Sequence, residues 1–501
     1  MTGDLLIRGG RVFDLKGDVD HPPLADLLIQ DGRIAAVAPD LVADPSVPVV
    51  EAAGQLLIPG LVNAHYHSHD VLLRGMFEQM PLDLWGLFSG PASYSGVGPD
   101  DVGLRTLLGA ADCLANGITT LQDMVTVTGD AAAQLDSITG AYEASGIRVS
   151  LGLQIADRPA AETVPGWDAI GGAAGARLRQ PVDVTALRAL IEAAFERAPQ
   201  EGLTWALAPS APQRASDGLL EWVADMARGR DIQVFTHLYE ARNQAVMGRT
   251  GCAEGSLLAR LERFGLVGPG LTIAHGVWID EDELARFGTA GANLAFNPAS
   301  NLKLLNGFAP IRAYADAGAG LAIGCDNCSG NDAQSLFQSM KLFALYWGMQ
   351  SDAGESGAAW KAFHAATLGG ARALGLTGQV GALRPGYCGD VVMLDLATST
   401  YRPLNSALNQ VVYGETGQSI TKVIVAGRVL VREGQLTDHP ARDLKAAAEE
   451  VRQRMLPQIA EVAARNAEIM APVLEAYRSA DAYPLPIDRY RMPRPCVCGE
   501  E

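Results

Sequence analysis

The sequence predicts an α/β protein in which a (β/α)₈ TIM barrel is joined to a small β-sandwich built from both ends of the chain. The chain has 501 residues, which exceeds the roughly 250 residues that a barrel needs and leaves room for an accessory domain. Its middle alternates short apolar runs with Ala- and Leu-rich stretches, a pattern typical of repeated βα units. Segments of strand character lie on both sides of this middle part.

Eight apolar runs are predicted as the strands of a barrel over residues 59–379. They lie at Leu57–Val62, Ile118–Gln122, Val149–Gln154, Thr204–Leu207, Gln233–Thr236, Thr272–Ala274, Asn293–Phe296 and Leu321–Gly324. Eight such units close one parallel barrel, and the active site of such a barrel lies at the carboxyl ends of its strands.

The two ends of the chain are predicted to form one composite β-sandwich. Residues 1–58 and residues 380–440 both hold short β-branched runs bounded by turn residues, among them GDVVMLDL, NQVVYGE and ITKVIVAGRVLVREGQL in the second segment. Because a sheet of two or three strands is marginal in water, we expect the two segments to pair with each other.

The remaining segment, residues 441–501, is predicted as a helical extension. Pro457 and Pro472 interrupt its helical pattern, so we expect two or three short helices there. Cys496 and Cys498 form a C-x-C near its end, which leaves open a metal site or a frayed tail.

Composition restricts the classes of partner. Hydrophobic residues make up 48% of the chain and charged residues 19%, as in a globular enzyme. A net charge of -18 without clustered Lys and Arg argues against a nucleic-acid partner. The sequence shows no signal peptide and no membrane span, so we expect a cytoplasmic protein. Seven scattered cysteines do not suggest a disulfide framework.

Polar residues gather at the predicted carboxyl ends of the barrel strands. The sequence has eight histidines, and five of them fall at or just beyond such an end: His65, His67, His69, His237 and His275. Because side chains on a strand alternate between its faces, His65 and His67 are expected to point together into the barrel mouth. Glu240 follows His237 by three residues, and Asp326 ends the last strand. Together these positions predict a metal site.

Two segments resemble motifs of the amidohydrolase superfamily. Pro59–His67 reads PGLVNAHYH and is similar to P-G-x-[VI]-[ND]-x-H-x-H. Gly381–Asp390 reads GALRPGYCGD and is similar to G-x-L-x-x-G-x-x-[AG]-D. The resemblance covers nearly the whole chain and implies a metal-dependent hydrolase. The fourth-strand segment TWALAPSAP lacks the modified Lys that bridges two metals, so the resemblance favours the branch with one metal ion.

The resemblance also implies roles for individual residues. It assigns one divalent ion to His65, His67, His237 and Asp326. Imidazoles and a carboxylate suit Zn²⁺, with Fe²⁺ as the other candidate, and they leave a position for water. His275 is expected to orient that water beside Asp326, and Glu240 is expected to carry the proton to the leaving nitrogen.

Within the one-metal branch, the sequence resembles aminohydrolases and chlorohydrolases that act on nitrogen heterocycles. Leu72–Trp85 is similar to their substrate loop, and Phe296–Ile311 is similar to their P-x-S-N-x-x-L stretch. Candidate substrate contacts are His69, Trp85, Ser210, Asn301 and Asn327. Ser210 stands where nucleoside-type deaminases of this branch have His, which argues against a purine nucleoside.

Three functions remain open at this point. The first is deamination of a free heterocycle, with release of ammonia or an amine. The second is hydrolysis of a C–N or C–Cl bond in a triazine or an aryl urea, because the same metal ligands serve several leaving groups. The third is an inactive barrel used as an interaction scaffold, which the intact ligand set disfavours. The expected partners are a small-molecule substrate and, by resemblance, further copies of the chain in a homodimer or larger assembly.

Overall fold

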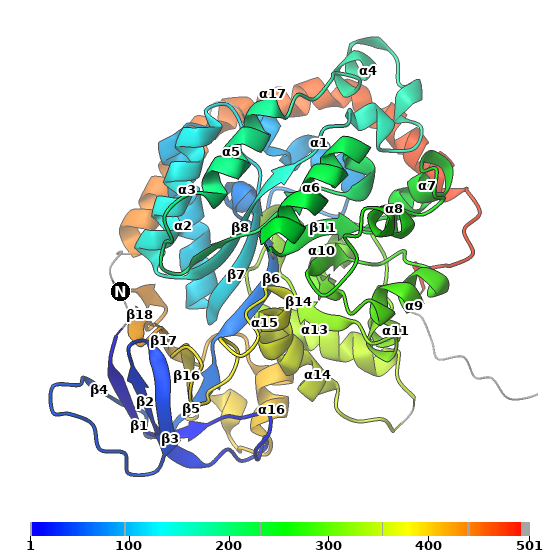
Figure 1. Cartoon of the computed structure of the whole chain (residues 1–501). Helices are drawn as coiled ribbons and strands as arrows, with labels where there is room; N and C mark the ends of the chain where they lie inside the picture. The colour runs from blue at the N-terminus through cyan, green and yellow to red at the C-terminus, as the bar shows by residue number, and fades with distance from the viewer. Residues whose placement is uncertain (1–2, 95–96, 231, 353, 438–440, 492–501) are drawn as a thin grey trace, which may run out of the picture.

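The computed structural model describes residues 3–94, 97–230, 232–352, 354–437 and 441–491. Its strands form one sheet at one end of the molecule and a barrel of parallel strands above it (Figure 1). Cys496 and Cys498 lie outside the described residues. Among the helices of these ranges, none is both long and apolar enough to cross a membrane.

A nine-stranded sheet contains strands from both ends of the chain. Its order is β19-β18-β17-β16-β5-β1-β2-β3, with β4 beside β1. The strands are β1 Leu5–Val12, β2 Leu24–Gln30, β3 Arg33–Ala38, β4 Val49–Glu51, β5 Gln55–Pro59, β16 Val391–Asp395, β17 Ile420–Val425, β18 Arg428–Arg432 and β19 Gln435–Leu436. The two ends meet at β5, which pairs with β1 on one edge and with β16 on the other. The predicted pairing of the two ends is therefore confirmed, and hydrogen bonding runs continuously through β5.

The barrel strands are short. They are β6 Leu61–His67, β7 Ile118–Val125, β8 Arg148–Ile155, β9 Leu203–Trp205, β10 Ala208–Pro209, β11 Val234–Leu238, β12 Leu271–His275, β13 Asn293–Phe296, β14 Gly320–Ile323 and β15 Asp326–Asn327. Strands β6 to β10 and β11 to β14 run parallel, and the bridge between Leu207 and Val234 connects the two groups. Strand β15 pairs with β6 and closes the circle. The predicted fold class is confirmed.

The predicted first strand, Leu57–Val62, is wrong in its bounds. The chain leaves the nine-stranded sheet at Pro59 and enters the barrel at Leu61. Gly60 lies between them, and a Cβ atom there would stand 2.1 Å from Oγ1 of Thr119. The apolar run is therefore divided between two sheets at a point where only glycine fits.

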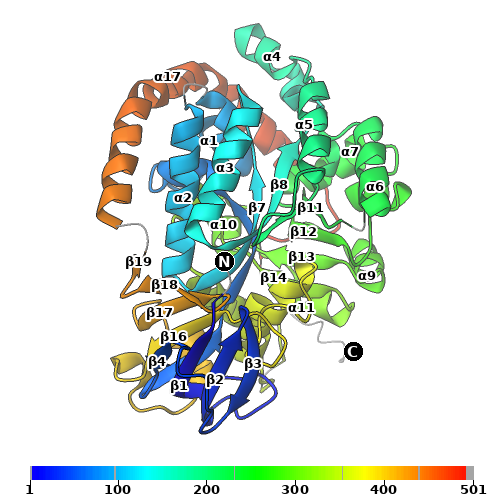
Figure 2. The same cartoon turned by 60° about the vertical axis from the view of Figure 1, so that its left-hand side comes forward.

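Helices cover the outside of the barrel (Figures 1 and 2). The longer ones are α1 Leu82–Ser89, α2 Pro99–Ala115, α3 Ala131–Ser145, α5 Thr185–Phe195, α6 Asp217–Arg230, α7 Arg242–Gly251, α9 Glu281–Thr289, α13 Leu336–Met349 and α17 Ala441–Asp481. Shorter ones are α4 Gly172–Leu178, α8 Leu257–Arg263, α10 Pro298–Lys303, α11 Ile311–Asp316, α12 Cys328–Asn331, α14 Ala358–His364, α15 Gly370–Ala373 and α16 Ala407–Asn409.

The run NQVVYGE is helical, contrary to its predicted strand character. The helix α16, capped by the side chain of Ser406, ends at Asn409, the first residue of the run, and the chain continues as a π-helical turn over Gln410–Gly414. Val411 and Val412 are both buried, although they are consecutive. Two successive buried residues do not alternate as a half-buried strand requires, and β-branching alone misled the prediction.

The C-terminal extension is also different from the prediction. Residues Ala441–Asp481 form the single helix α17, with Pro457 and Pro472 inside it. The helix packs against α1, α2 and α7 and buries Val462, Ile469 and Val473. We attribute its continuity across both prolines to this buried face, since packing can compensate for the hydrogen bonds that proline removes.

Candidate metal centre and active-site pocket

Four potential ligand side chains meet at the barrel mouth. His65 and His67 come from β6, His237 from β11 and Asp326 from β15. His65, His67 and Asp326 offer ligand atoms that all lie within 4.8 Å of one another, and His65, His237 and His275 form an overlapping group of the same kind. The alternation of β6 places both of its histidines on the inner side, as the H-x-H spacing predicted.

The separations between these atoms suit a small cation. Nε2 of His65 and Nε2 of His67 each lie 3.4 Å from Oδ1 of Asp326. Nε2 of His237 lies 3.3 Å from Nε2 of His67. Ligands held at 2.0 to 2.1 Å in a tetrahedron stand about 3.3 Å apart, so the spacing matches that of zinc ligands.

The hydrogen bonds of the rings leave lone pairs facing the centre. Nδ1 of His67 donates to the carbonyl of Met124 at 2.6 Å, and Nδ1 of His237 donates to the carbonyl of Ser210 at 2.6 Å. The two Nε2 atoms of these neutral rings therefore carry no proton and repel each other. Among the described residues, Nε2 of His65 and Oδ1 of Asp326 also have no hydrogen-bond partner. A cation held between them would satisfy all four atoms.

The charge states fit the same conclusion. Burial lowers the pKa of His67 to about 3, assisted by repulsion from His65. Burial also lowers the pKa of His65 and holds the pKa of His237 well below its usual value. Burial opposes ionisation of Asp326, yet His65, His275 and His67 keep its pKa well below the ordinary range. Neutral imidazoles and an ionised carboxylate are the forms that bind metal.

The backbone is strained at this centre. His275 and Asp326 have φ angles of 76° and 63°, and Tyr239, in the loop that leads to Glu240, has a φ of 52°. Non-glycine residues rarely adopt this left-handed region, and they do so preferentially at functional sites. The conformation aims His275 and Asp326 at the same point.

Glu240 and His275 lie beside the ligand cluster. Oε2 of Glu240 is 3.6 Å from Nε2 of His275, which is 3.8 Å from Oδ2 of Asp326. Nδ2 of Asn306 donates to Oε1 of Glu240 at 3.1 Å. Burial raises the pKa of Glu240 to about 7. A carboxyl group with that pKa can both accept and donate a proton at neutral pH.

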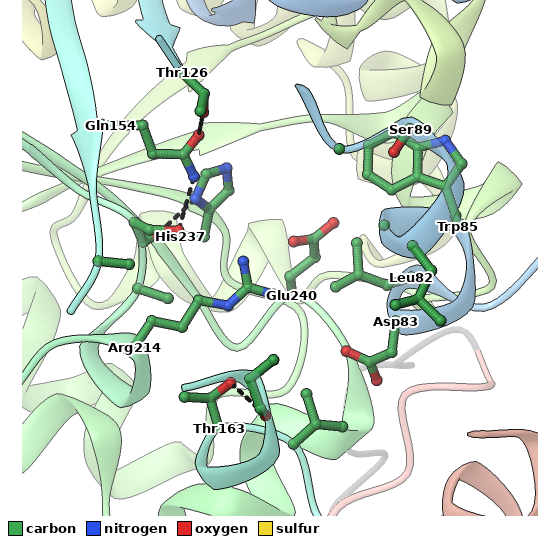
Figure 3. Close-up of a pocket in the computed structure, with 18 of the residues that line it drawn as sticks. Leu82, Asp83, Trp85, Ser89, Thr126, Gln154, Thr163, Arg214, His237 and Glu240 are labelled. Carbon is green, nitrogen blue, oxygen red and sulfur yellow. Dashed lines mark hydrogen bonds between the residues drawn. The ribbon is translucent and has the colours of Figure 1, made fainter. Parts of the chain in front are cut away.

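A cavity of about 430 Å³ opens above the cluster and is lined by residues from many elements. His67, His237, His275, Glu240 and Asp326 form its floor. Its walls include Asp83, Trp85, Trp167, Ser210 and Arg214, several of which are drawn in Figure 3.

Four of the five predicted substrate contacts line this cavity. They are His69, Trp85, Ser210 and Asn327. Trp85 already donates its indole N–H to Oγ of Ser329 at 3.1 Å, so its ring rather than its N–H is available. Asn301 is not among the lining residues, contrary to the prediction of substrate contact. Its Oδ1 accepts a hydrogen bond from Nδ1 of His275 at 2.8 Å, so it holds that ring from behind.

Asp83, Gln154, Arg214 and Trp167 also line the cavity, although none of them was predicted as a substrate contact. Gln154 ends a predicted strand, and Asp83 lies in the predicted substrate loop, so position alone could have indicated both. Arg214 and Trp167 lie in the short 3-10 turns Pro212–Arg214 and Trp167–Ala169, and no sequence pattern distinguishes them.

Comparison with known proteins gives one family. A family model described as the amidohydrolase family matches residues 56–430. A 5'-deoxyadenosine deaminase of Methanothermobacter thermautotrophicus is 28% identical over 436 residues, which cover 86% of this chain and 94% of that protein. A 5-methylthioadenosine/S-adenosylhomocysteine deaminase of Pyrococcus furiosus is 29% identical over 437 residues, which cover 86% and 96%.

Solved structures agree over most of the chain. An adenosine deaminase from Xanthomonas campestris with bound zinc has a TM-score of 0.76 and 29% identity, and the match covers 90% of this chain and 98% of that one. An atrazine chlorohydrolase from Arthrobacter aurescens complexed with zinc has a TM-score of 0.75 and 25% identity, with coverage of 89% and 100%.

Proposed function

The chain belongs to the amidohydrolase family, and from this premise we propose that it hydrolyses a carbon–nitrogen bond at an electron-poor ring carbon of a nitrogen heterocycle, releasing ammonia or an amine. One observation carries the proposal. His67, His237, Asp326 and Glu240 line one cavity whose size suits a small ring compound, and His65, the fourth potential ligand, lies 3.4 Å from Asp326.

His65, His67, His237 and Asp326 are the proposed ligands of one zinc ion. The lone pairs left without partners at His65 and Asp326 support this assignment, and two structural relatives contain zinc. When bound, such an ion lowers the pKa of water to about 7 and so supplies a nucleophile at neutral pH. Fe²⁺ suits the same donors.

Glu240 and His275 are the proposed proton-handling residues. Glu240 takes a proton from the attacking water and delivers it to the ring or to the leaving nitrogen, because its pKa of about 7 allows both transfers. His275 presents Nε2 to Glu240 and Asp326, at 3.6 and 3.8 Å, since its Nδ1 is hydrogen-bonded to Oδ1 of Asn301. In this position it would contact the attacking water beside Asp326 and orient it towards the substrate.

A second candidate function is hydrolysis of a C–Cl or C–N bond of a triazine. The atrazine chlorohydrolase of Arthrobacter aurescens supports it, as does Ser210, which occupies the position of the nucleoside-type His. The deaminase relatives named above support the first candidate. Both reactions use the same attack on a ring carbon and differ in the leaving group.

Two measurements test the proposal. Elemental analysis of the purified protein should give one zinc or iron per chain. Incubation with pyrimidines, oxidised purines, hydroxytriazines, adenine nucleosides and phenylureas, with separate assays for ammonia, amine and chloride, should identify one released product. A chain that turns over none of these in its metal-loaded form would overturn the proposal.

A further inference from the structure

The positively charged guanidinium of Arg214 lies at the cavity and has no hydrogen-bond or ion-pair partner among the described residues. It ends the short turn Pro212–Arg214 after β10, and its guanidinium extends towards Glu240 across from Asp83 (Figure 3). Within the part of the chain that the structure describes, no hydrogen bond or ion pair involves this guanidinium. By contrast, Arg158 of the same cavity contacts Glu162 and donates to the carbonyl of Gln213.

The two carboxyl groups whose pKa Arg214 influences, those of Asp83 and Glu240, already accept hydrogen bonds from amides. Oδ2 of Asp83 accepts from Nδ2 of Asn243 at 2.6 Å, and Oε1 of Glu240 accepts from Nδ2 of Asn306 at 3.1 Å. Arg214 influences both groups electrostatically, since its charge lowers the pKa of each against the effect of burial. Its five N–H donors are left for a molecule that enters the cavity.

Ser210 adds a second donor to the same wall. Oγ1 of Thr126 donates to Oε1 of Gln154 at 2.9 Å (Figure 3). Nε2 of Gln154 donates to Oγ of Ser210 at 2.7 Å. This direction uses a lone pair of Ser210 and leaves its O–H proton free to donate into the cavity. The wall formed by β10 and the turn after it therefore presents two donors, the hydroxyl of Ser210 and the guanidinium of Arg214.

We infer that Arg214 and Ser210 recognise an oxo or anionic edge of the substrate, so that the substrate is an amino-substituted heterocycle carrying ring oxo groups. A planar guanidinium matches two adjacent acceptors, and a neutral hydroxyl donor beside it extends the same preference. The unreacting edge of a neutral adenine ring offers neither charge nor oxo oxygen. The inference rests on the proposed function and narrows its substrate class to oxo-triazines and oxo-pyrimidines or oxo-purines.

Binding can be tested separately from turnover with cyanurate. This triazine carries three oxo groups and has no exocyclic amine to release, so calorimetry on the zinc-loaded protein reports recognition alone. We expect Arg214→Met to raise the Kd for monoanionic cyanurate about 30-fold, the loss typical of a hydrogen bond to a charged group. Arg214→Lys should restore part of the affinity because it keeps the charge without the planar fork.

Arg249→Met is the matched control. Its guanidinium bonds Asp280 at 2.7 Å and does not line this cavity, so the Kd should stay within about twofold of the parent value. An unchanged Kd in Arg214→Met, or an equal loss in Arg249→Met, would overturn the inference.

The rates of ammonia release from two triazines provide a second test of the inference. Ammonia release is measured with melamine, which has only amino groups, and with ammelide, which has one amino and two oxo groups. We expect the parent protein to prefer ammelide and Arg214→Met to lose that preference through a raised KM with kcat largely kept. Preference for melamine in the parent would contradict the inference. The protein could bind cyanurate through Arg214 and yet turn over none of the heterocycles. That result would support recognition of oxo groups by Arg214 but would refute the proposed function.

Discussion

At the barrel mouth, one hydrogen bond to the Nδ1 atom of each imidazole determines how that ring is oriented. Backbone carbonyls hold Nδ1 of His67 and Nδ1 of His237, and a side-chain amide holds Nδ1 of His275. Each ring is therefore fixed in the tautomer that presents Nε2 to the cavity. Glu240 differs from His67 and His237, because burial lowers the pKa of those two rings but raises the pKa of Glu240 to about 7.

Glu240→Gln tests the proton transfer. The variant keeps the shape of the side chain and the hydrogen bond with Asn306 but cannot take up a proton, so we expect kcat to fall about 100- to 10,000-fold with zinc content unchanged. Steady-state kinetics and elemental analysis measure the two quantities. Glu262→Gln is the control, because Glu262 pairs with Arg286 on the surface. Retained activity in Glu240→Gln removes this residue from its role.

His237→Ala tests the ligand assignment. Loss of a direct ligand should weaken zinc affinity by more than about 100-fold, beyond the effect of losing a residue that only orients a ligand. Competition with a zinc chelator measures the affinity. His21→Ala, at an exposed histidine far from the cluster in sequence, should show no change. Equal zinc affinity in His237→Ala and the parent would exclude His237 as a ligand.

Much of this site could be predicted from the sequence, since the strand period and the ends of apolar runs indicate which residues converge. His65, His67, His237 and Asp326 do meet as predicted. Asn301 and Arg214 show the limit. Asn301 lies behind His275, and Arg214 enters the cavity from an irregular turn. Neither orientation follows from a repeating pattern, because loops have no fixed side-chain period.

Among the elements, the helix α17 supports one wall of the cavity from outside the barrel. It packs against α1, which carries Asp83 and Trp85, and against the segment that carries Val164 and Trp167. Nδ2 of Asn466 donates to the carbonyl of Leu87 in α1 at 2.7 Å. Figure 2 shows this helix arching along the outside of α1 and α2. The wall opposite Arg214 is thus held in place by the C-terminal part of the chain.

Val473→Asp should loosen that wall. Val473 is 2% exposed, and a carboxylate there would be buried against α1 and the Trp167 segment without a partner. We expect kcat/KM to fall about 10- to 100-fold through displacement of wall residues, while zinc content stays constant. Met470→Asp on an exposed position of the same helix is the control, since Met470 is 38% exposed. Unchanged kinetics in Val473→Asp would show that α17 does not position the wall.

The sequence predicted the helical character of α17 but not its continuity. Pro457 and Pro472 weaken a helix locally, and that effect is visible in the sequence. The compensating contacts with α1, α2 and α7 come from residues more than 200 positions away. A local pattern carries no information on such partners.

At the scale of the whole molecule, Asp390 joins the nine-stranded sheet to the barrel. Its side chain pairs with Arg148 of β8 and accepts from the backbone N of Ala426 at 2.9 Å. Its carbonyl accepts from the backbone N of Gly60 at 2.9 Å. The last residue of the G-x-L-x-x-G-x-x-[AG]-D stretch therefore has a structural explanation, which the motif alone did not provide.

Asp390→Ala should destabilise this junction. The substitution leaves the guanidinium of Arg148, whose side chain is only 14% exposed, without its carboxylate. Breaking a buried pair in this way costs about 3 to 5 kcal/mol, which thermal denaturation would show as a lower midpoint. The double variant Asp390→Ala with Arg148→Met removes the unpaired charge and should recover part of the loss. Equal midpoints for Asp390→Ala and the parent would contradict this account.

Pairing of β15 with β6 places the first and last barrel strands on either side of the proposed ion. A ribosome delivers His65 and His67 early and Asp326 only after nearly the whole barrel has emerged. We therefore expect each new chain to bind its metal ion late in folding. The bound ion would then stabilise the contact between the first and the last barrel strands. In refolding experiments, zinc capture should coincide with the slowest spectroscopic phase, and capture in the earliest phase would exclude this order.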